Sequence, residues 1–532
     1  MTTRPSLPVS SAALGGRVRD ALGLALDTPD ASGMVRVQVG PQRLVETCVQ
    51  VAERLPAPLA TMIGLDERAH TASFRLIYVF RASGGWIGVE TLVPAASPRF
   101  PSVAARLPAA HWYEREVQDL LGVVAEGHPD PRRLVLHDDW PDGVHPLRKD
   151  FDPAQPVPRL DRPPQRLHHL HGEGIVEIPV GPIHAGVIEP GHFRFAAVGE
   201  VVLHLETRLF YTHRGIEKLA EGKSAERVLQ IAERICGACS LSHAVSYSQA
   251  IEALARTSPP PRALALRTLF LELERLYNHV GDLGNVCAGT GFAVGASQGA
   301  RLKDDLQRLN ERLVGNRFLR GVVALGGVRR DLDIVSVEDA RSTLARVEAE
   351  FGRFVELTSG SESYQERLLG TGTVSRQAAA DFGAVGVAAR ASGLDRDVRR
   401  DHPYAGYGGI PVPVPVQREG DVRARVRQRI DETLASFAIA QQVLDALPAG
   451  PILSPLGPIP EYQSALGATE SPRGENLHWV RSGPRGSIDR YRVRSASSCN
   501  WPVVALSVPG NMVPDFPVIN KSFELCYSCL DR

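Results

Sequence analysis

Two pairs of cysteines are the residues of this 532-residue chain best suited to chemistry. Cys236 and Cys239 form the first Cys-x-x-Cys pair, and Cys526 and Cys529 form the second, close to the last residue. A spacing of three brings both sulfurs of a pair to one side of a helix turn or a tight loop, where they can share a metal. Thiolates select soft or borderline metals such as zinc, nickel, copper(I) or iron–sulfur clusters. We therefore predict that the two pairs converge on one metal site, no more than about 7 Å apart.

Spacing alone leaves three kinds of site open: a structural zinc site, a redox dithiol and a catalytic metal centre. The two pairs of a zinc ribbon usually lie about 15–20 residues apart, whereas more than half of the chain separates Cys239 from Cys526. That separation favours a catalytic metal over the common structural zinc pattern. His243 follows Cys239 by four residues, so on a helix it would lie over the same face, as a ligand or as a donor to a sulfur.

The composition is that of an ordinary globular protein, with 43% hydrophobic and 23% charged residues. The 60 Lys and Arg residues balance the 60 Asp and Glu residues, so net charge provides no bulk attraction to nucleic acid or anionic lipid. The chain has no run of about 18 apolar residues, and its N-terminus lacks the apolar core of a secretory signal. These observations exclude disordered, collagen-like and integral-membrane classes, and we expect no nucleic-acid partner. The remaining cysteines are interpreted as small buried hydrophobes: Cys48, Cys287 and Cys499.

The elements before the first cysteine pair predict a small α/β domain over residues 1–151. Apolar residues recur at helical spacing in segment 42–55, and segment 112–121 predicts a short acidic helix. Two further segments, 74–80 and 86–93, are rich in β-forming residues and predict paired strands. The sequence therefore predicts a mixed sheet and helices ahead of the metal-binding part.

Residues 152–171 are rich in proline and predict a semi-rigid linker. The second domain, residues 172–532, begins with short β-like runs and continues with long amphipathic patterns that indicate a helical bundle. From about Pro472 the pattern becomes irregular and β-like again. The fold class is therefore expected to be α+β. The predicted long helices are one from Ser224 with Val228, Ile231, Ile235 and Cys239 on one face, then 264–280, preceded by Pro261, 337–357 and 422–447.

The surroundings of both cysteine pairs resemble the metal-binding motifs of NiFe-hydrogenase large subunits. The first pair lies in RICGACSLSH, and the second in CYSCLDR. Matching segments also include GPIHAGVIEPGHFRF at 181–195, HRGIEKLAEGK at 213–223, LELERLYNHVGDLG at 271–284, GGVRRDL at 326–332 and ESPRGENLHW at 470–479. The first domain resembles the 30-kDa-type subunit of complex I, through YEREVQDLLGV at 113–123, HPDPRRLVL at 128–136 and HPLRKDF at 145–151. The whole is similar to the large, catalytic subunit of group 4 hydrogenases of the formate hydrogenlyase and hydrogenase-4 type, a fusion of 30-kDa-like and 49-kDa-like subunits of complex I.

This resemblance implies a NiFe(CO)(CN)2 centre, in which iron carries carbon monoxide and cyanide. By position, Cys236 and Cys526 resemble the terminal thiolates of nickel, and Cys239 and Cys529 resemble the thiolates that bridge nickel and iron. The implied reaction is the reversible reduction of two protons by two electrons to hydrogen, with a terminal thiolate as base. Complex I relatives generally lack the four cysteines, which this chain retains.

Three further residues match functional positions of the family. Glu189 matches the glutamate that passes protons near a terminal thiolate, Arg473 the arginine over the iron diatomics, and His243 the histidine that donates to a bridging sulfur. Each also has an ordinary interpretation: a loop carboxylate, a salt bridge and a buried core histidine. The chain departs from the family at Glu524 and Leu525, where an Asp-Pro pair is usual.

Glu217 matches a ligand of a structural divalent ion near the carboxy terminus of the family. That ion usually needs a terminal histidine as well, and this chain has Arg532 there. Because a guanidinium cannot bind a cation, we expect instead that Arg532 is buried and forms an ion pair with Glu217.

The resemblance also implies partners and a location. No further cysteine cluster is evident, so no iron–sulfur cluster is expected in this chain. Electrons would arrive through a small subunit with a proximal 4Fe–4S cluster and other electron-transfer iron–sulfur subunits. The implied complex is cytoplasmic and peripheral on the inner membrane, with antiporter-like membrane-arm subunits, and a maturation protease would process the chain end. Two alternatives stay open: a redox-dead or quinone-linked coupling subunit related to complex I, for which His184 is the matching quinone-site histidine, and a structural zinc protein.

Overall fold

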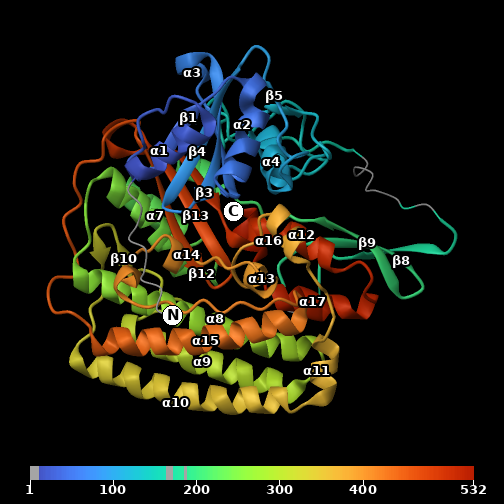
Figure 1. Ribbon diagram of the computed structural model, residues 1–532, viewed down its shortest axis with the longest axis vertical. Coiled ribbons are helices and arrows are strands. Elements are labelled where there is room, and N and C mark those ends of the chain that lie inside the picture. Colours follow the sequence, from blue (N-terminus) through green and yellow to red (C-terminus); the bar gives the residue numbers. More distant parts are fainter. Residues whose placement is uncertain (1–10, 163–169, 171, 185–187) are drawn as a thin grey trace.

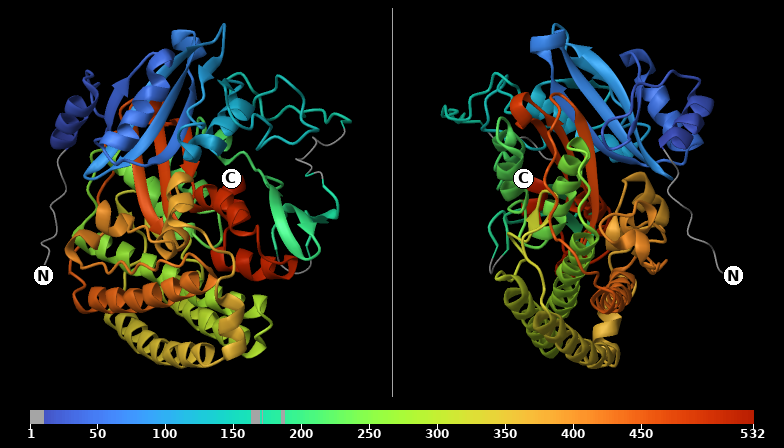
Figure 2. Two further views of the ribbon diagram at one scale, coloured as in Figure 1. Left: turned by 45° about the vertical axis from the view of Figure 1, so that its right-hand side comes forward. Right: turned by 90° about the vertical axis from the view of Figure 1, so that its left-hand side faces the viewer.

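The computed structural model describes residues 11–162, 170, 172–184 and 188–532. The first domain lies at one end of the molecule, a second sheet occupies the centre, and a layer of long helices closes the other end (Figures 1 and 2). The α+β fold class predicted from the sequence is confirmed.

The first domain is built on one mixed sheet with the strand order β1-β4-β3-β2. Its central hairpin pairs β3 and β4 in an antiparallel ladder, and β1 joins β4 in parallel. The predicted strands at 74–80 and 86–93 lie inside β3 and β4, and the predicted helices are α2 and α4. The elements are α1 (Ser11–Leu22), β1 (Val35–Gln38), α2 (Pro41–Arg54), β2 (Leu59–Asp66), α3 (Arg68–Thr71), β3 (Ser73–Ala82), β4 (Gly85–Pro94), β5 (Arg99–Pro101), α4 (His111–Leu121) and β6 (Val124–Glu126).

The predicted proline-rich linker carries no helix or strand in its described residues, 152–162 and 170. Residues 163–169 and 171 of that segment lie outside the described residues. The domain boundaries at 151 and 172 stay predictions. After the linker, three antiparallel strands form a sheet that projects from the body on the right of Figure 1: β7 (Ile175–Val180), β8 (His192–Val198) and β9 (Val201–Arg208).

The layer of long helices confirms three of the predicted helices. These are α8 (Pro261–Gly289), α10 (Ile334–Ser359) and α15 (Val422–Asp445), with α9 (Ala293–Val314) between α8 and α10. Glycines allow α8 and α9 to approach closely, because a Cβ at Gly299 would lie 2.6 Å from the Cα of Gly284. The shorter elements of this domain are α5 (Ile216–Ala220), β10 (Val323–Ala324), β11 (Gly327–Val328), α11 (Glu362–Leu368), α12 (Arg376–Asp381), α13 (Gly386–Ala391) and α14 (Val398–Asp401).

The helix predicted from Ser224 is shorter than expected, and this difference shapes the metal site. α6 (Ala225–Ala232) ends before Ile235, and the next helix, α7 (Ser240–Leu254), starts directly after Cys239. The first cysteine pair therefore lies in a loop, and the prediction that Cys239 continues the face of α6 is wrong. Gly237 stands between the cysteines, where its low helix propensity favours a break.

The last part of the chain is more regular than its sequence indicates. Its strands form the central antiparallel sheet, β12 (Ser464–Ser471), β13 (Gly474–Ser482) and β14 (Ile488–Arg494). The β-like character predicted after Pro472 is found in β13 and β14, but the prediction of an irregular ending is wrong, because three helices follow: α16 (Ala496–Ser507), α17 (Phe516–Phe523) and α18 (Tyr527–Asp531). α16 is buried around much of its circumference, so its sequence shows no amphipathic pattern. It also contains Pro502, a residue that is rare inside helices. In the described part of the chain, no helix has both the length and the apolar character needed to cross a membrane.

Candidate metal centre

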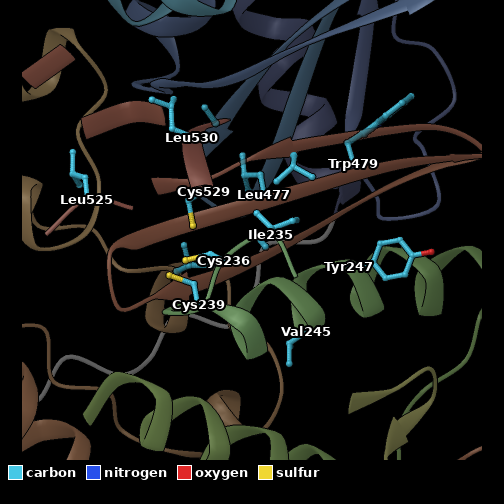
Figure 3. Close-up of a cluster of buried hydrophobic side chains, with 14 of the residues drawn as sticks. Ile235, Cys236, Cys239, Val245, Tyr247, Leu477, Trp479, Leu525, Cys529 and Leu530 are labelled. Atoms are coloured by element: carbon cyan, nitrogen blue, oxygen red, sulfur yellow. The ribbon is translucent and has the colours of Figure 1, made fainter. Parts of the chain in front are cut away.

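The four predicted cysteines meet in one cluster. The sulfurs of Cys236, Cys239, Cys526 and Cys529 all lie within 4.8 Å of one another. Figure 3 shows the sulfurs of Cys236, Cys239 and Cys529 turned toward a common point between the loop and α18. The predicted convergence of the two pairs is therefore confirmed. Three of the four side chains are buried, and Cys526 is partly exposed.

One arginine joins the two cysteine segments. The Nη2 of Arg214 donates to the backbone oxygen of Ile235, before the first pair, and to that of Ser528, inside the second, both at 2.9 Å. A single guanidinium thus fixes two segments that are remote in the sequence. Arg214 lies in the HRGIEK segment, but its side-chain contacts are to backbone oxygens, so the sequence gives no sign of them.

Helix α8 holds the first cysteine loop from the other side. Its Glu274 accepts hydrogen bonds from the backbone N–H groups of Leu241 at 2.6 Å and Ser242 at 3.1 Å, at the start of α7. A carboxylate in this place satisfies free donors and complements the helix dipole. Burial nevertheless raises the pKa of Glu274 to about 7. Asn278, one turn further on, donates to the carbonyl of Ala238 at 2.8 Å. Both residues lie within the LELERLYNHVGDLG segment, but nothing in that segment indicates their contacts with the cysteine loop.

The donor set fits a soft metal. The neighbouring thiols hold the pKa of Cys236 well below its ordinary value, whereas the pKa values of Cys239 and Cys529 are raised well above theirs, by the charge on Cys236 and by burial. The backbone N–H of Ala238 also points at the sulfur of Cys236, at 3.2 Å. The thiolate is the form that binds a metal, and four convergent sulfurs form a complete ligand set for nickel or zinc.

Three family models match the chain. Residues 37–157 match the respiratory-chain NADH dehydrogenase 30 Kd subunit, and residues 290–459 and 456–532 match the 49 Kd subunit of the same enzyme. Residues 214–282, which contain the first cysteine pair, match the nickel-dependent hydrogenase model.

Individual relatives extend over both domains. Formate hydrogenlyase subunit 5 of Escherichia coli K12 is 38% identical over 89% of this chain and 84% of its own length. Hydrogenase-4 component G of the same organism has the same identity and coverage. The carbon monoxide-induced hydrogenase of Rhodospirillum rubrum is 31% identical over 67% of this chain and 99% of its own length. The chain belongs to the formate hydrogenlyase and hydrogenase-4 family of NiFe-hydrogenase large subunits.

In this hydrogenase-family chain, His243 lies beside the sulfur cluster but outside it. Its Nε2 is 3.4 Å from the sulfur of Cys529. Its backbone N–H closes the first turn of α7 on the carbonyl of Cys239, at 3.0 Å. The other ring nitrogen lies 2.8 Å from Nε2 of His478 on β13. The geometry is that of a hydrogen-bond partner of a sulfur, and His478 is a contact that sequence reasoning missed.

Arg473 is held beside the cluster by a two-point ion pair with Asp282 of α8. One bond, Nη2 to Oδ1, measures 3.0 Å, and Nη1 pairs with Oδ2. Arg429 also contacts Asp282. Although burial opposes ionisation of Asp282, the charge of Arg473 keeps the pKa of the Asp282 carboxyl well below its usual range. The Nε of Arg473 has no hydrogen-bond partner among the described residues. The ESPRGENLHW segment around Arg473 does not reveal that Asp282 is its partner, because Asp282 is almost 200 residues away in the sequence.

A cavity of about 570 Å³ adjoins the cluster. Glu189 lines it and accepts a hydrogen bond from the backbone N–H of Ser528 at 2.9 Å. Glu524, the residue that replaces the usual aspartate, also lines the cavity, and burial raises its pKa to about 7. His184, Cys236, Arg473 and Cys526 also line the cavity.

Glu217 lies apart from the sulfurs, in a buried cluster of arginines. Its carboxylate is 2.9 Å from Nη1 of Arg532, and 3.0 and 3.3 Å from Arg490 and Arg492. The predicted burial of Arg532 and its ion pair with Glu217 are confirmed. Three guanidinium groups around one carboxylate oppose the binding of a divalent cation there.

Proposed function

We propose that this chain is the catalytic subunit of a membrane-associated NiFe-hydrogenase that reversibly reduces protons to hydrogen. The observation that carries the proposal is the convergence of the four cysteines within a chain of this family. Cys236 and Cys526 would be terminal ligands of nickel, and Cys239 and Cys529 would bridge nickel to an iron that carries carbon monoxide and cyanide. When bound, this centre supplies the two-electron redox chemistry of hydrogen.

The surrounding residues have distinct tasks in this proposal. Cys526 is partly exposed and lines the same cavity as Glu189, so its thiolate serves as the base in this proposal. Glu189 moves protons between that sulfur and the solvent side of the cavity. Arg473, oriented by Asp282, presents a fixed positive charge and donors toward the small iron ligands. His243 donates to the sulfur of Cys529.

Electrons must reach the cluster through other subunits. Cys48, Cys287 and Cys499 belong to no multi-ligand cluster in the part of the chain that the structure describes. The proposed partners are a small subunit with a proximal 4Fe–4S cluster, further iron–sulfur subunits and antiporter-like membrane-arm subunits, with a maturation protease acting on the precursor. The complex would lie on the cytoplasmic face of the inner membrane. Names such as formate hydrogenlyase subunit 5 and hydrogenase-4 component G support a multi-subunit assembly.

A second candidate function is supported by the size and lining of the cavity. Its volume of about 570 Å³ far exceeds the needs of hydrogen, and His184 lines it together with Cys526. A quinone-linked or redox-dead coupling subunit related to complex I would use such a space. The four retained cysteines favour the hydrogenase.

Metal and infrared analysis of protein matured with its partner subunits tests the proposal. Nickel and iron together, with carbon monoxide and cyanide stretches and hydrogen turnover, would support it. Zinc alone would support a structural site, and protein without metal would support the coupling role. The variants Cys236→Ser and Cys526→Ser should abolish nickel binding. Cys287→Ser is the matched control, because this buried cysteine on α8 lies outside the cluster and should leave nickel in place.

A further inference from the structure

A chain of buried side chains leads away from the sulfur of Cys529. His243 Nε2 lies 3.4 Å from that sulfur, and His243 Nδ1 lies 2.8 Å from Nε2 of His478. His478 Nδ1 in turn lies 2.7 Å from the hydroxyl of Tyr491. All three side chains are fully buried. These hydrogen bonds thus join two imidazoles and one phenol in series, with the proposed metal-binding cysteine at one end.

The central sheet and α7 bring these side chains together. His478 pairs with Val493 and Val480 with Tyr491 across β13 and β14, so His478 and Tyr491 are diagonal neighbours on one face. The residue opposite His478 on β12 is Gly467. A Cβ at Gly467 would lie 1.9 Å from the backbone oxygen of Ser246, so its absence lets α7 pack directly on the sheet. That close approach brings His243 within reach of His478.

Once Cys529 binds a metal, the hydrogen bonds that join Cys529, His243, His478 and Tyr491 can run in only one direction. A metal-bound cysteine is a thiolate and has no proton to donate, so Nε2 of His243 must be the donor. Nδ1 of a neutral imidazole is then an acceptor, and His478 must donate to it from Nε2. Nδ1 of His478 becomes an acceptor in turn, which the hydroxyl of Tyr491 satisfies.

The opposite direction fails at Tyr491. If His243 donated to His478, then His478 would have to donate to the phenol oxygen of Tyr491. The hydroxyl proton of Tyr491 would then lack an acceptor, because His478 is its only hydrogen-bond partner in the described part of the chain. A buried polar hydrogen without a partner is unfavourable.

We propose that His478 and Tyr491 are positioning residues that fix the ring proton of His243 on Nε2 and so direct a hydrogen bond at the sulfur of Cys529. The inference rests on the proposed function, since it requires Cys529 to be a metal thiolate. A hydrogen bond to a thiolate withdraws electron density from it and raises the potential of the bound metal. Tyr491, although two residues removed from the sulfur's own partner, would therefore tune the metal centre.

The test compares Tyr491→Phe with Tyr247→Phe in the assembled enzyme. Tyr247 is as deeply buried and packs edge-on against Tyr491 at 5.6 Å, but its hydroxyl donates to the backbone oxygen of Ala225. Two readouts go beyond activity: the midpoint potential of the nickel centre and the ¹⁵N shifts of labelled histidine rings in its diamagnetic state. Nickel content is measured in every variant.

Tyr491→Phe should keep its nickel and shift the midpoint potential to more negative values. In this variant the proton of His478 should no longer be confined to Nε2, and the ¹⁵N shifts of the ring should show this change. Tyr247→Phe should match the unsubstituted enzyme. His478→Gln, which retains a donor toward His243, should shift the potential less than His478→Leu. Equal potentials and ring shifts in the two tyrosine variants would overturn the inference, as would loss of nickel in Tyr491→Phe alone. Absence of nickel from the unsubstituted, matured enzyme would contradict the proposed function instead.

Discussion

Arg532 and Glu116 form a buried ion pair that links the end of the chain to the first domain, with Nη2 and Oε1 2.9 Å apart. The same guanidinium contacts Glu217, also at 2.9 Å. Glu116 lies on α4, whereas Glu217 lies in the HRGIEK segment. Because Arg532 follows Cys529 by three residues, the first domain takes part in holding the second cysteine pair in place.

Glu217→Gln should destabilise the protein strongly. The substitution removes the carboxylate that faces Arg490, Arg492 and Arg532, and leaves these buried cations partly uncompensated. Removing one partner of a buried ion pair typically costs about 3–5 kcal/mol. Chemical denaturation should show the loss. Glu338→Gln, an exposed carboxylate on α10, is the control and should change stability by less than about 0.5 kcal/mol. Equal midpoints for the two variants would contradict the assigned role of Glu217.

Glu116 should make the protein sensitive to acid. Although burial opposes ionisation, Arg492 and Arg532 lower the pKa of Glu116 from 4.5 to about 2. A carboxyl whose pKa is lower in the folded state binds its proton first in the unfolded state, so stability rises with pH. The contribution of Glu116 is therefore complete above about pH 5 and is lost as the pH falls toward 2.

The measurement is the melting temperature of the unsubstituted protein and of Glu116→Gln between pH 7 and pH 2. The difference between them should be largest near neutral pH and shrink as the solution is acidified. Glu338→Gln should follow the unsubstituted curve throughout. Parallel curves for Glu116→Gln and the unsubstituted protein would show that Glu116 does not carry this pH dependence.

Glu189→Gln should impair turnover without loss of nickel. A glutamine oxygen can still accept the backbone N–H of Ser528, so the local structure is kept, but the side chain no longer exchanges a proton. Loss of a general acid–base group typically slows turnover by about 10²- to 10⁴-fold. Hydrogen evolution and nickel content are measured together, with the exposed Glu200→Gln as the control. Undiminished hydrogen evolution would assign proton transfer to another group.

Arg473→Lys should likewise retain nickel and lose activity. Lysine keeps the charge but cannot reproduce the two-point contact with Asp282, so the group beside the cluster is misplaced. Changes to residues that orient a metal site typically cost about 10- to 100-fold in activity. The control is Arg308→Lys, at a surface pair with Asp304 on α9. Recovery of folded Arg473→Lys without nickel would show that Arg473 is needed for metal binding itself.

Gly467→Ala should disrupt the packing of α7 on the central sheet. The added methyl group would lie 1.9 Å from the backbone oxygen of Ser246, and backbone cannot move aside as a side chain can. Overpacking usually costs about 1–3 kcal/mol, and this contact should reach at least the upper end. Gly352→Ala is the matched control on α10, where no atom lies within 4 Å and alanine should stabilise by about 0.5–1 kcal/mol. A thermal melt of both variants decides the sign.

Local patterns in the sequence determined the kind of chemistry and most of the regular structure. Two Cys-x-x-Cys pairs identify a thiolate metal site because three-residue spacing is a local property, and the long helices were predictable because their apolar stripes repeat within each segment. The loop at Cys236 and the helix around Pro502 were predicted wrongly. In the first, the helix ends before the cysteine pair although its apolar spacing continues, and the second is buried nearly all round, so it has no stripe to detect.

Only the tertiary structure decided which partners complete the site. Arg214 binds backbone oxygens, and every residue has one, so the sequence cannot indicate which segments Arg214 contacts. Asp282 and His478 gain their roles because they face Arg473 and His243 from other elements. A buried charge or ring nitrogen must find a complementary group, but its nearest partner in space can come from anywhere in the chain. That choice is made by the packing of α7 and α8 against the central sheet.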